Sequence, residues 1–138
     1  MSWIDPLPEQ VQALVADAAD DSPVVMINLL RYRDRAEYPQ GSDAAPCSGR
    51  EAYERYGALV LPMLGEVGAR VLWRGKPRQT VIGPASEHWD EVLLVHYPSR
   101  AAFLTMVGRA DYQRAVVHRR AALADSRLIA TATVASSF

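Results

Sequence analysis

The order of the predicted elements indicates an α+β fold of the ferredoxin-like class: βαββαβ with an extra N-terminal helix and an antiparallel sheet. A second observation concerns the strands, which are apolar at both odd and even positions and therefore need a cover on both faces of the sheet. The helices of one chain cover one face only. We therefore expect a second copy to cover the other, in a dimer whose two sheets pack face to face.

The first elements of the chain are a helix, a strand and a long loop. Apolar residues at helical spacing predict an amphipathic helix after Pro8, which ends at Ser22-Pro23. Residues 24–30 are rich in β-branched residues and follow a proline, which favours a strand. Residues 33–49 are polar and have no period. A loop of this length is expected to be mobile and to gate a cleft, with Cys47 accessible to thiol reagents.

The central elements are predicted from one helical stripe and two apolar runs. From Arg50 the apolar residues follow a helical period, and this helix is expected to end at Gly68. Residues 69–75 form the second strand, which is expected to continue after a bend as residues 79–83. The third strand covers residues 91–97 and is again apolar at both parities.

The last elements begin at a clear helix signal. Ser99 is a good N-cap for a short helix, and Gly108 is expected to stop it. A longer helix over residues 111–124 and a last strand over residues 127–135 complete the pattern. We therefore expect a single domain, whose parts are an N-terminal helical extension over residues 1–22, a ferredoxin-like core over residues 23–135 and the long loop within it.

Composition and charge exclude several classes of protein. With 138 residues, 49% of them hydrophobic and 22% charged, the chain is typical of a folded domain. Its net charge of −1 argues against electrostatic binding of nucleic acid or of an anionic membrane. The single cysteine suits a reducing compartment, and the N-terminus lacks the features of a signal peptide. The expected location is the cytoplasm.

An ordered set of sequence strings is similar to a known family. The strings are Ile27–Arg33, Gly49–Gly57, Gly68–Gly75, Trp89–Val95, Tyr97–Arg100, Tyr112, His118-Arg119 and Asp125–Ile129. In this order they resemble the family called domain of unknown function 1330, over most of the chain. The resemblance implies a dimeric α/β barrel. Relatives at the level of fold include cofactor-independent monooxygenases, haem-degrading monooxygenases, isomerases and cyclases, which is an analogy of fold alone.

Two polar residues interrupt the apolar strands. Asn28 lies in the first strand and His96 in the third, and each needs a hydrogen-bond partner if it is buried. These strands are expected to be central neighbours that run parallel, so the two side chains are expected to meet if they share a face. If they face opposite sides, Asn28 is expected to contact Tyr56 or Arg119 on the helical side, and His96 is expected to face the second copy of the dimer. Asn28 is either a structural amide or a donor that stabilises an oxyanion, and His96 is either a buried structural histidine or a general base.

The helices and turns supply the other candidates. Arg119 lies on an apolar stripe, where it either extends to solvent, pairs with a carboxylate or clamps an anion, with His118 beside it as acid or base. Asp90 either caps a turn or stands at the mouth of a cleft. Aromatic residues that either fill the core or line a substrate pocket are Tyr53, Tyr56, Trp73, Trp89 and Tyr112.

Two functions remain open at this point. The first is an enzyme without a cofactor or metal, either a monooxygenase or an isomerase or cyclase, acting on a small apolar molecule with a carbonyl or phenol group. The catalytic residues would be Asn28, His96, His118 and Arg119. The second is a non-catalytic module that binds a small molecule or another protein. No nucleotide-binding loop, nucleophile elbow or closely spaced histidine pair is present in the sequence.

Overall fold

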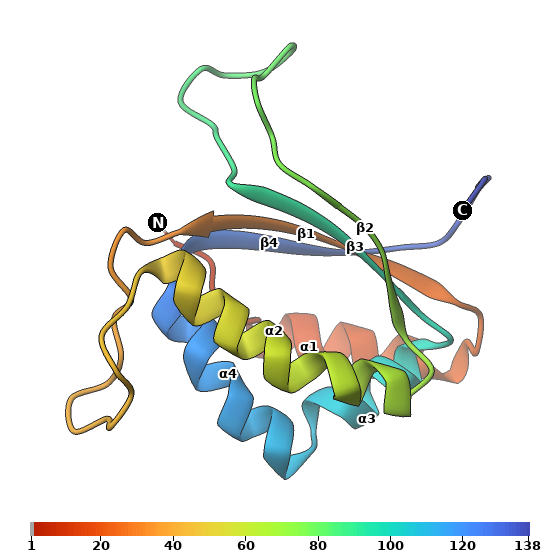
Figure 1. The fold of residues 1–138 in the computed structure, drawn as a ribbon. Helices are drawn as coiled ribbons and strands as arrows, with labels where there is room; N and C mark the ends of the chain where they lie inside the picture. Colours follow the sequence, from red (N-terminus) through yellow and green to blue (C-terminus); the bar gives the residue numbers. More distant parts are fainter. Residues whose placement is uncertain (1) are drawn as a thin grey trace.

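The computed structural model describes residues 2–138 as a four-stranded antiparallel sheet with helices on one side of it (Figure 1). The strand order is β2-β3-β1-β4, which is the order of a ferredoxin-like βαββαβ unit. The predicted α+β class is therefore confirmed. The elements are α1 (Pro8–Ala16), η1 (Asp17–Ala19), β1 (Val24–Tyr32), α2 (Gly49–Glu66), β2 (Arg70–Gly75), β3 (Glu91–Tyr97), α3 (Arg100–Val107), α4 (Ala110–Ala122) and β4 (Leu123–Thr131).

Local capping explains where two of the helices begin. At the start of α2, the Ser48 hydroxyl accepts a hydrogen bond from the Glu51 backbone N–H, and the Glu51 carboxylate accepts one from the Ser48 N–H. At the start of α3, Ser99 accepts from Ala102 N–H, as the sequence predicts. Gly108 then caps the C-terminal end of α3.

Two predicted boundaries are wrong. Residues 79–83 do not continue the second strand, because β2 ends at Gly75 and the chain up to β3 is an irregular loop. The helix α4 ends at Ala122, and β4 begins at Leu123, four residues before the predicted start. Tertiary hydrogen bonds hold this transition, since the carbonyl of Ala122 accepts from Arg33 N–H at 2.8 Å.

The predicted meeting of Asn28 and His96 is also wrong. Strands β1 and β3 are neighbours, but they run antiparallel. In their register Asn28 lies opposite Leu93, whereas His96 lies opposite Val25. Side chains alternate between the two faces of a sheet, so Asn28 and His96 point to opposite faces. Asn28 shares the helix-covered face with Met26, and His96 lies on the face without helices.

The face without helices, which we call the open face, is strongly apolar. Its central side chains are Ile27 and Leu29 of β1 and Val92 and Leu94 of β3, all only partly buried. The loop between β2 and β3 rises from this side of the sheet (Figure 1). Further exposed hydrophobic residues on the open face or in that loop are Trp73, Val81, Ile82 and Ile129.

The long loop over residues 33–49 differs from its prediction. Cys47 is buried, with 5% of its surface exposed, and packs among Leu30, Ala52 and Leu123. Backbone hydrogen bonds anchor the loop, including one from Ala36 N–H to the Cys47 carbonyl. An accessible Cys47 is therefore contradicted, because the thiol lies in a small hydrophobic cluster under the loop.

Candidate functional site

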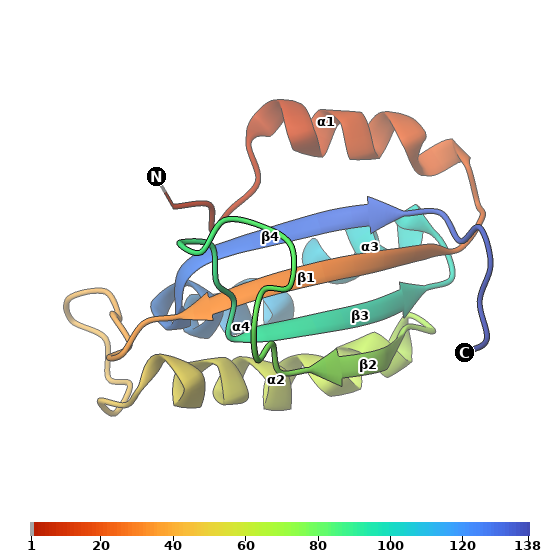
Figure 2. The ribbon, with the colours of Figure 1, turned by 90° about the horizontal axis from the view of Figure 1, so that it is seen from above.

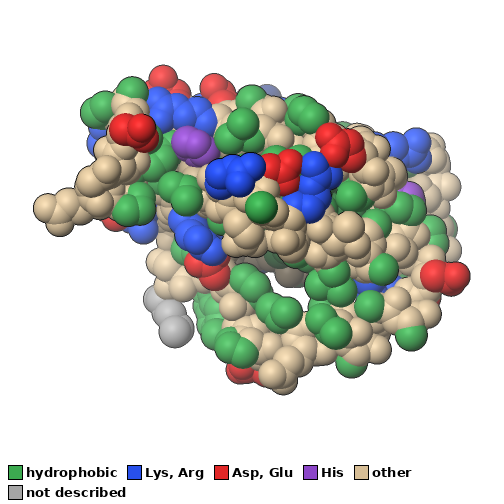
Figure 3. Space-filling model, turned by 90° about the horizontal axis from the view of Figure 1, so that it is seen from below, with side chains coloured by type: hydrophobic (Ala, Val, Ile, Leu, Met, Phe, Trp, Pro, Cys, Tyr) green, Lys and Arg blue, Asp and Glu red, His purple; other side chains and the backbone are tan. Residues whose placement is uncertain are grey.

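A large cavity lies on the helix-covered side of the sheet, between α1 and the body of the protein (Figure 3). Its volume is about 1170 Å³, and hydrophobic side chains line most of it. The helix α1 runs beside the free edge of β4 and not against α2 or α4 (Figure 2). No residue of α1 is buried. The apolar residues Val11 and Leu14 of this helix form one wall of the cavity. Residues 33–49 do not line this cavity, so the predicted gate is not placed to close it.

Three of the predicted tyrosines reach the cavity. Tyr53 and Tyr56 follow the inner stripe of α2, and Tyr112 comes from the first turn of α4. The hydroxyls of Tyr56 and Tyr112 share a hydrogen bond of 2.9 Å. Burial raises the pKa of Tyr53 to about 12, and burial next to Tyr112 raises the pKa of Tyr56 well above its ordinary value. These phenols therefore remain protonated and can donate hydrogen bonds.

Asn28 lines the same cavity from the centre of β1. Its amide nitrogen donates to the Leu93 carbonyl at 3.3 Å and to the Met26 carbonyl at 3.4 Å. These bonds orient the side chain and use both donors, which leaves the amide oxygen as an acceptor. Asn28 therefore has a structural role, through these two hydrogen bonds, and it also lines the pocket. The group that remains free is the amide oxygen, which is an acceptor and not the predicted oxyanion donor.

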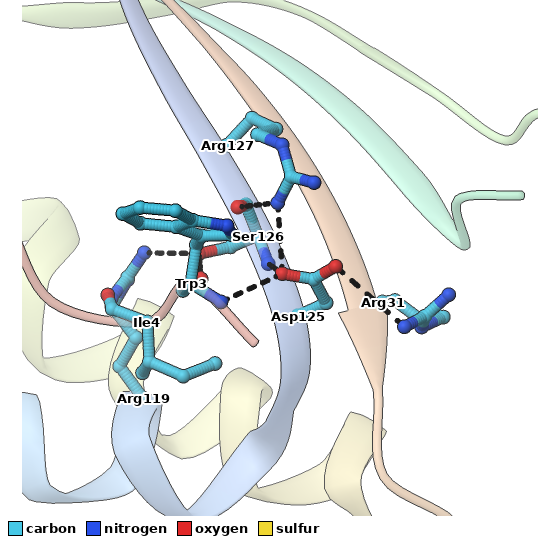
Figure 4. A network of polar contacts seen from close by, with 7 residues as sticks. All are labelled: Trp3, Ile4, Arg31, Arg119, Asp125, Ser126 and Arg127. Carbon is cyan, nitrogen blue, oxygen red and sulfur yellow. Dashed lines mark hydrogen bonds and ion pairs between the residues drawn. The ribbon is translucent and has the colours of Figure 1, made fainter. Parts of the chain in front are cut away.

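Arg119 lies at the end of the cavity where the N-terminal segment returns to the body (Figure 4). Its guanidinium donates to the Ile4 carbonyl at 2.5 Å and to the Ser126 hydroxyl at 3.3 Å. Ser126 in turn donates to the Trp3 carbonyl, and the Asp125 carboxylate accepts from the Trp3 N–H at 2.9 Å. Arg119 thus helps to hold residues 3–5 against β4, and it faces the cavity.

A buried carboxylate completes the polar part of the cavity. Glu91, 6% exposed, accepts hydrogen bonds from the Tyr32 hydroxyl at 2.9 Å and from Arg74 at 2.7 Å. Burial alone would raise the pKa of Glu91, but the hydrogen bonds from Arg74 and Tyr32 outweigh it and lower the pKa below 4.5. Glu91 is therefore ionised and paired at neutral pH, and it is not available as a proton donor.

The lowered pKa of Glu91 predicts how the stability depends on pH. A carboxyl whose folded pKa is depressed stabilises the fold above its unfolded value, and this contribution is lost as the pH falls through the folded pKa. Replacing Glu91 with glutamine is expected to lower the free energy of unfolding at pH 7 by about 1–3 kcal/mol. The difference from wild type should shrink below about pH 4.5, as measured by urea unfolding at several pH values. A difference that stays constant down to pH 3 would show that the charge contributes nothing.

Both histidine candidates lie outside the cavity. His96 faces the opposite side of the sheet. The Nδ1 atom of His118 lies 2.6 Å from the Tyr38 hydroxyl, which also accepts from Arg55 at 3.2 Å. Burial and the nearby charge of Arg55 lower the pKa of His118, which favours its neutral form. His118 thus fastens the long loop to α4.

The remaining candidates are also placed elsewhere. Trp73 is exposed on the open face, where its ring lies beside Gly75. Trp89 stacks under the guanidinium of Arg127, 5.2 Å from the ring centre. Asp90 accepts from the Tyr32 N–H at 2.8 Å and lines a separate hollow of about 530 Å³. None of Trp73, Trp89 and Asp90 lines the large cavity.

Sequence reasoning missed several residues of the site. Glu91 had a visible signal, since it is a carboxylate at the start of an otherwise apolar strand. Trp3 and Ile4 had only a weak one, as two apolar residues in a polar N-terminus. The hydrogen bonds of Trp3 with Asp125 and Ser126 join the two ends of the chain, and no local pattern in the sequence indicates such a pairing.

Within residues 2–138, no group of three or more histidine, cysteine, aspartate or glutamate side chains is arranged to hold a metal ion. None of the described helices is both long enough and apolar enough to cross a membrane.

The chain is similar to solved structures over nearly its whole length. The crystal structure of the RPA0582 protein, a protein of unknown function from Rhodopseudomonas palustris, is 39% identical, with a TM-score of 0.91 and coverage of 99% of this chain and 100% of that chain. A structure of the methylated form of that protein matches with the same identity and TM-score, covering 99% and 98%. A dimeric ferredoxin-like protein of unknown function from Thermobifida fusca is 14% identical, with a TM-score of 0.50 and coverage of 83% and 93%, which supports the fold alone.

No match is found among the curated proteins. Residues 46–133, more than half of the chain, match the model of the family described as domain of unknown function (DUF1330). The resemblance seen in the sequence is therefore confirmed, and the chain belongs to the DUF1330 family.

Proposed function

We propose that this protein binds a small, largely apolar molecule with a carbonyl, phenol or acidic group in the cavity beneath α1. The observation that carries the proposal is the convergence of a few polar groups on a large apolar cavity, which is the usual composition of a ligand site. Asn28 offers an acceptor, the tyrosines offer donors, and Arg119 offers a positive charge.

Between the two functions left open by the sequence, the geometry favours binding over catalysis. General acid–base chemistry at neutral pH needs a group that titrates there, and histidine is the usual one. His96 and His118 lie away from the cavity, and the pKa values of Tyr53 and Tyr56 are raised. An isomerase or a cofactor-independent monooxygenase stays the second candidate, because Arg119 and the tyrosine hydroxyls could stabilise an enolate or phenolate. Oxygen uptake with a panel of phenols and quinols tests for a monooxygenase, and conversion of the compounds without oxygen uptake tests for an isomerase or cyclase.

Filling the cavity from α2 is expected to abolish binding. Gly57 lines the cavity, and a Cβ atom added there meets nothing within 4 Å, so tryptophan at this position would project into the hollow. Gly65 lies on the same helix with equally free space around its Cβ, but it does not line the cavity. We expect Gly57→Trp to lose at least tenfold in affinity for the neutral dye Nile red, measured by fluorescence titration, and Gly65→Trp to bind as wild type does. Equal binding by both variants would contradict the proposed site.

We also propose that the protein is a homodimer that buries the open face of the sheet. The apolar side chains of β1 and β3 on this face are only partly buried and lie beside the exposed Trp73, and large apolar patches of this kind usually mark an interface. The dimeric state of the Thermobifida fusca protein of the same fold agrees with this arrangement. The cavity lies on the other side of the sheet, so each copy would keep its own site.

A further inference from the structure

We infer that the ligand of this cavity is an amphipathic monocarboxylate, with its carboxylate on Arg119 and the Tyr56–Tyr112 hydroxyl pair, and its apolar chain against the inner side of α1. This inference rests on the proposed function and names the chemical class of the ligand. It goes further than a general apolar pocket, because it requires one negative charge at a defined end of the cavity.

The charge balance of the lining calls for an anion. The residues that line the cavity include five arginines and three carboxylates. Arg74 is neutralised by Glu91, Arg120 forms an ion pair with Asp5 at 3.0 Å, and Arg127 forms one at 2.8 Å with Asp125, which does not line the cavity. Among residues 2–138, Arg119 has no carboxylate within ion-pair distance, and its two hydrogen bonds go to neutral oxygens. A half-buried cation without a counter-ion is a suitable partner for a ligand carboxylate.

The tyrosine hydroxyls supply the hydrogen bonds that a carboxylate accepts. In the contact between Tyr56 and Tyr112, one hydroxyl donates to the other, so one proton of the pair remains free. The Tyr53 hydroxyl, on the same helix as Tyr56, donates to no other residue of the described chain. Both free donors stay protonated at neutral pH, since a raised pKa keeps these phenols neutral. An ionised carboxylate only accepts hydrogen bonds, and it therefore matches a cavity whose lining offers a cation and two free donors.

The helix α1 supplies the apolar wall for the rest of the ligand. It spans the cavity as an arch that is fixed at both ends. At its N-terminal end Trp3 and Ile4 are held by Asp125, Ser126 and Arg119 (Figure 4). The other end is held by an ion pair of 3.8 Å between Asp20 and Arg100.

Between these two anchors, Val11 remains 39% exposed, and both Val11 and Leu14 face the cavity. An apolar chain in the cavity would remove these side chains from water, and it would leave the anchors of the arch intact.

The test compares dodecanoate with dodecanol, which has the same chain and no charge, by displacement of Nile red from the full-length protein. We expect dodecanoate to bind at least tenfold more tightly than dodecanol. Replacing Arg119 with glutamine should remove this preference, whereas Arg119→Lys, which keeps the charge, should retain part of it. Arg114 is an exposed arginine on the same helix that does not line the cavity, so Arg114→Gln is the matched control and should behave as wild type.

The possible results separate this inference from the proposed function. If dodecanol binds as tightly as dodecanoate, or if Arg119→Gln keeps the preference, the carboxylate assignment is overturned while the cavity remains a binding site. If Nile red and both chains fail to bind to the wild-type protein, the proposed function fails as well. Because Arg119 also holds Ile4, the readout is the ratio of the dodecanoate and dodecanol affinities within each variant, since a loosened N-terminal segment would weaken the binding of both chains alike.

Discussion

Replacing Gly49 with alanine is expected to lower the free energy of unfolding by about 3 kcal/mol, the upper end of the usual cost of overpacking. Gly49 is buried at the first turn of α2, where its N–H donates to the Arg33 carbonyl at 3.1 Å. An added Cβ atom would overlap the backbone of Arg33 and the carbonyl oxygen of Ala122. Both neighbours are backbone atoms at the junction of β1, α2 and β4, so they cannot move aside as a flexible side chain could.

Urea unfolding followed by circular dichroism measures this effect, with two other glycines of α2 as controls. Gly57 and Gly65 have open space around an added Cβ. Because glycine is unfavourable inside a helix, Gly57→Ala and Gly65→Ala are expected to raise the stability by about 0.5–1 kcal/mol each. A Gly49→Ala variant as stable as wild type would mean that the end of β1 and the start of α2 are not packed this closely.

Replacing Leu94 with aspartate is expected to convert the protein from a dimer into a monomer. Leu94 lies at the centre of the open face, opposite Ile27 on one side and Trp73 on the other. In the proposed dimer its side chain would be removed from water, and an unpaired carboxylate at that position would cost several kcal/mol in each copy. Sedimentation equilibrium should give about 30 kDa for wild type, twice the chain mass of 15.2 kDa, and about 15 kDa for the variant.

The control for this experiment is Leu59→Asp. Leu59 is an exposed leucine, 47% exposed, that lies on α2 on the other side of the sheet and does not line the cavity. This variant should remain a dimer. A wild-type protein of about 15 kDa at micromolar concentration would contradict the proposed dimer, and dissociation of both variants would show that the open face is not the interface.

Several elements could be predicted from the sequence because their signals are local. The N-cap at Ser99 and the stop at Gly108 depend on neighbouring residues only, and the structure confirms both. The inner stripe of α2, with Tyr53 and Tyr56, follows from the helical period alone. By contrast, α4 ends at Ala122 without a local breaker, since the carbonyls at its end accept hydrogen bonds from Arg33 and from the long loop.

The burial of Cys47 is another feature that local reasoning predicted wrongly. Its neighbours in sequence are Pro46 and Ser48, which are typical of an exposed loop. Its neighbours in space are Leu30, Ala52 and Leu123, which come from three different elements. The network through Arg55, Tyr38 and His118 holds the loop over this cluster, because it joins Tyr38 of the loop to side chains of α2 and α4.

The sequence by itself determined that both faces of the sheet need a cover, because β1 and β3 are apolar at odd and even positions alike. It also determined which residues of one strand share a face, since alternation is a property of the strand itself. Only the tertiary structure decided that Asn28 faces the cavity and His96 the open face, because the faces of two strands are related by their pairing register. The site at Arg119 was decided in the same way, since Ile4 and Ser126, its hydrogen-bond partners, lie 122 residues apart in sequence and meet only when the chain folds.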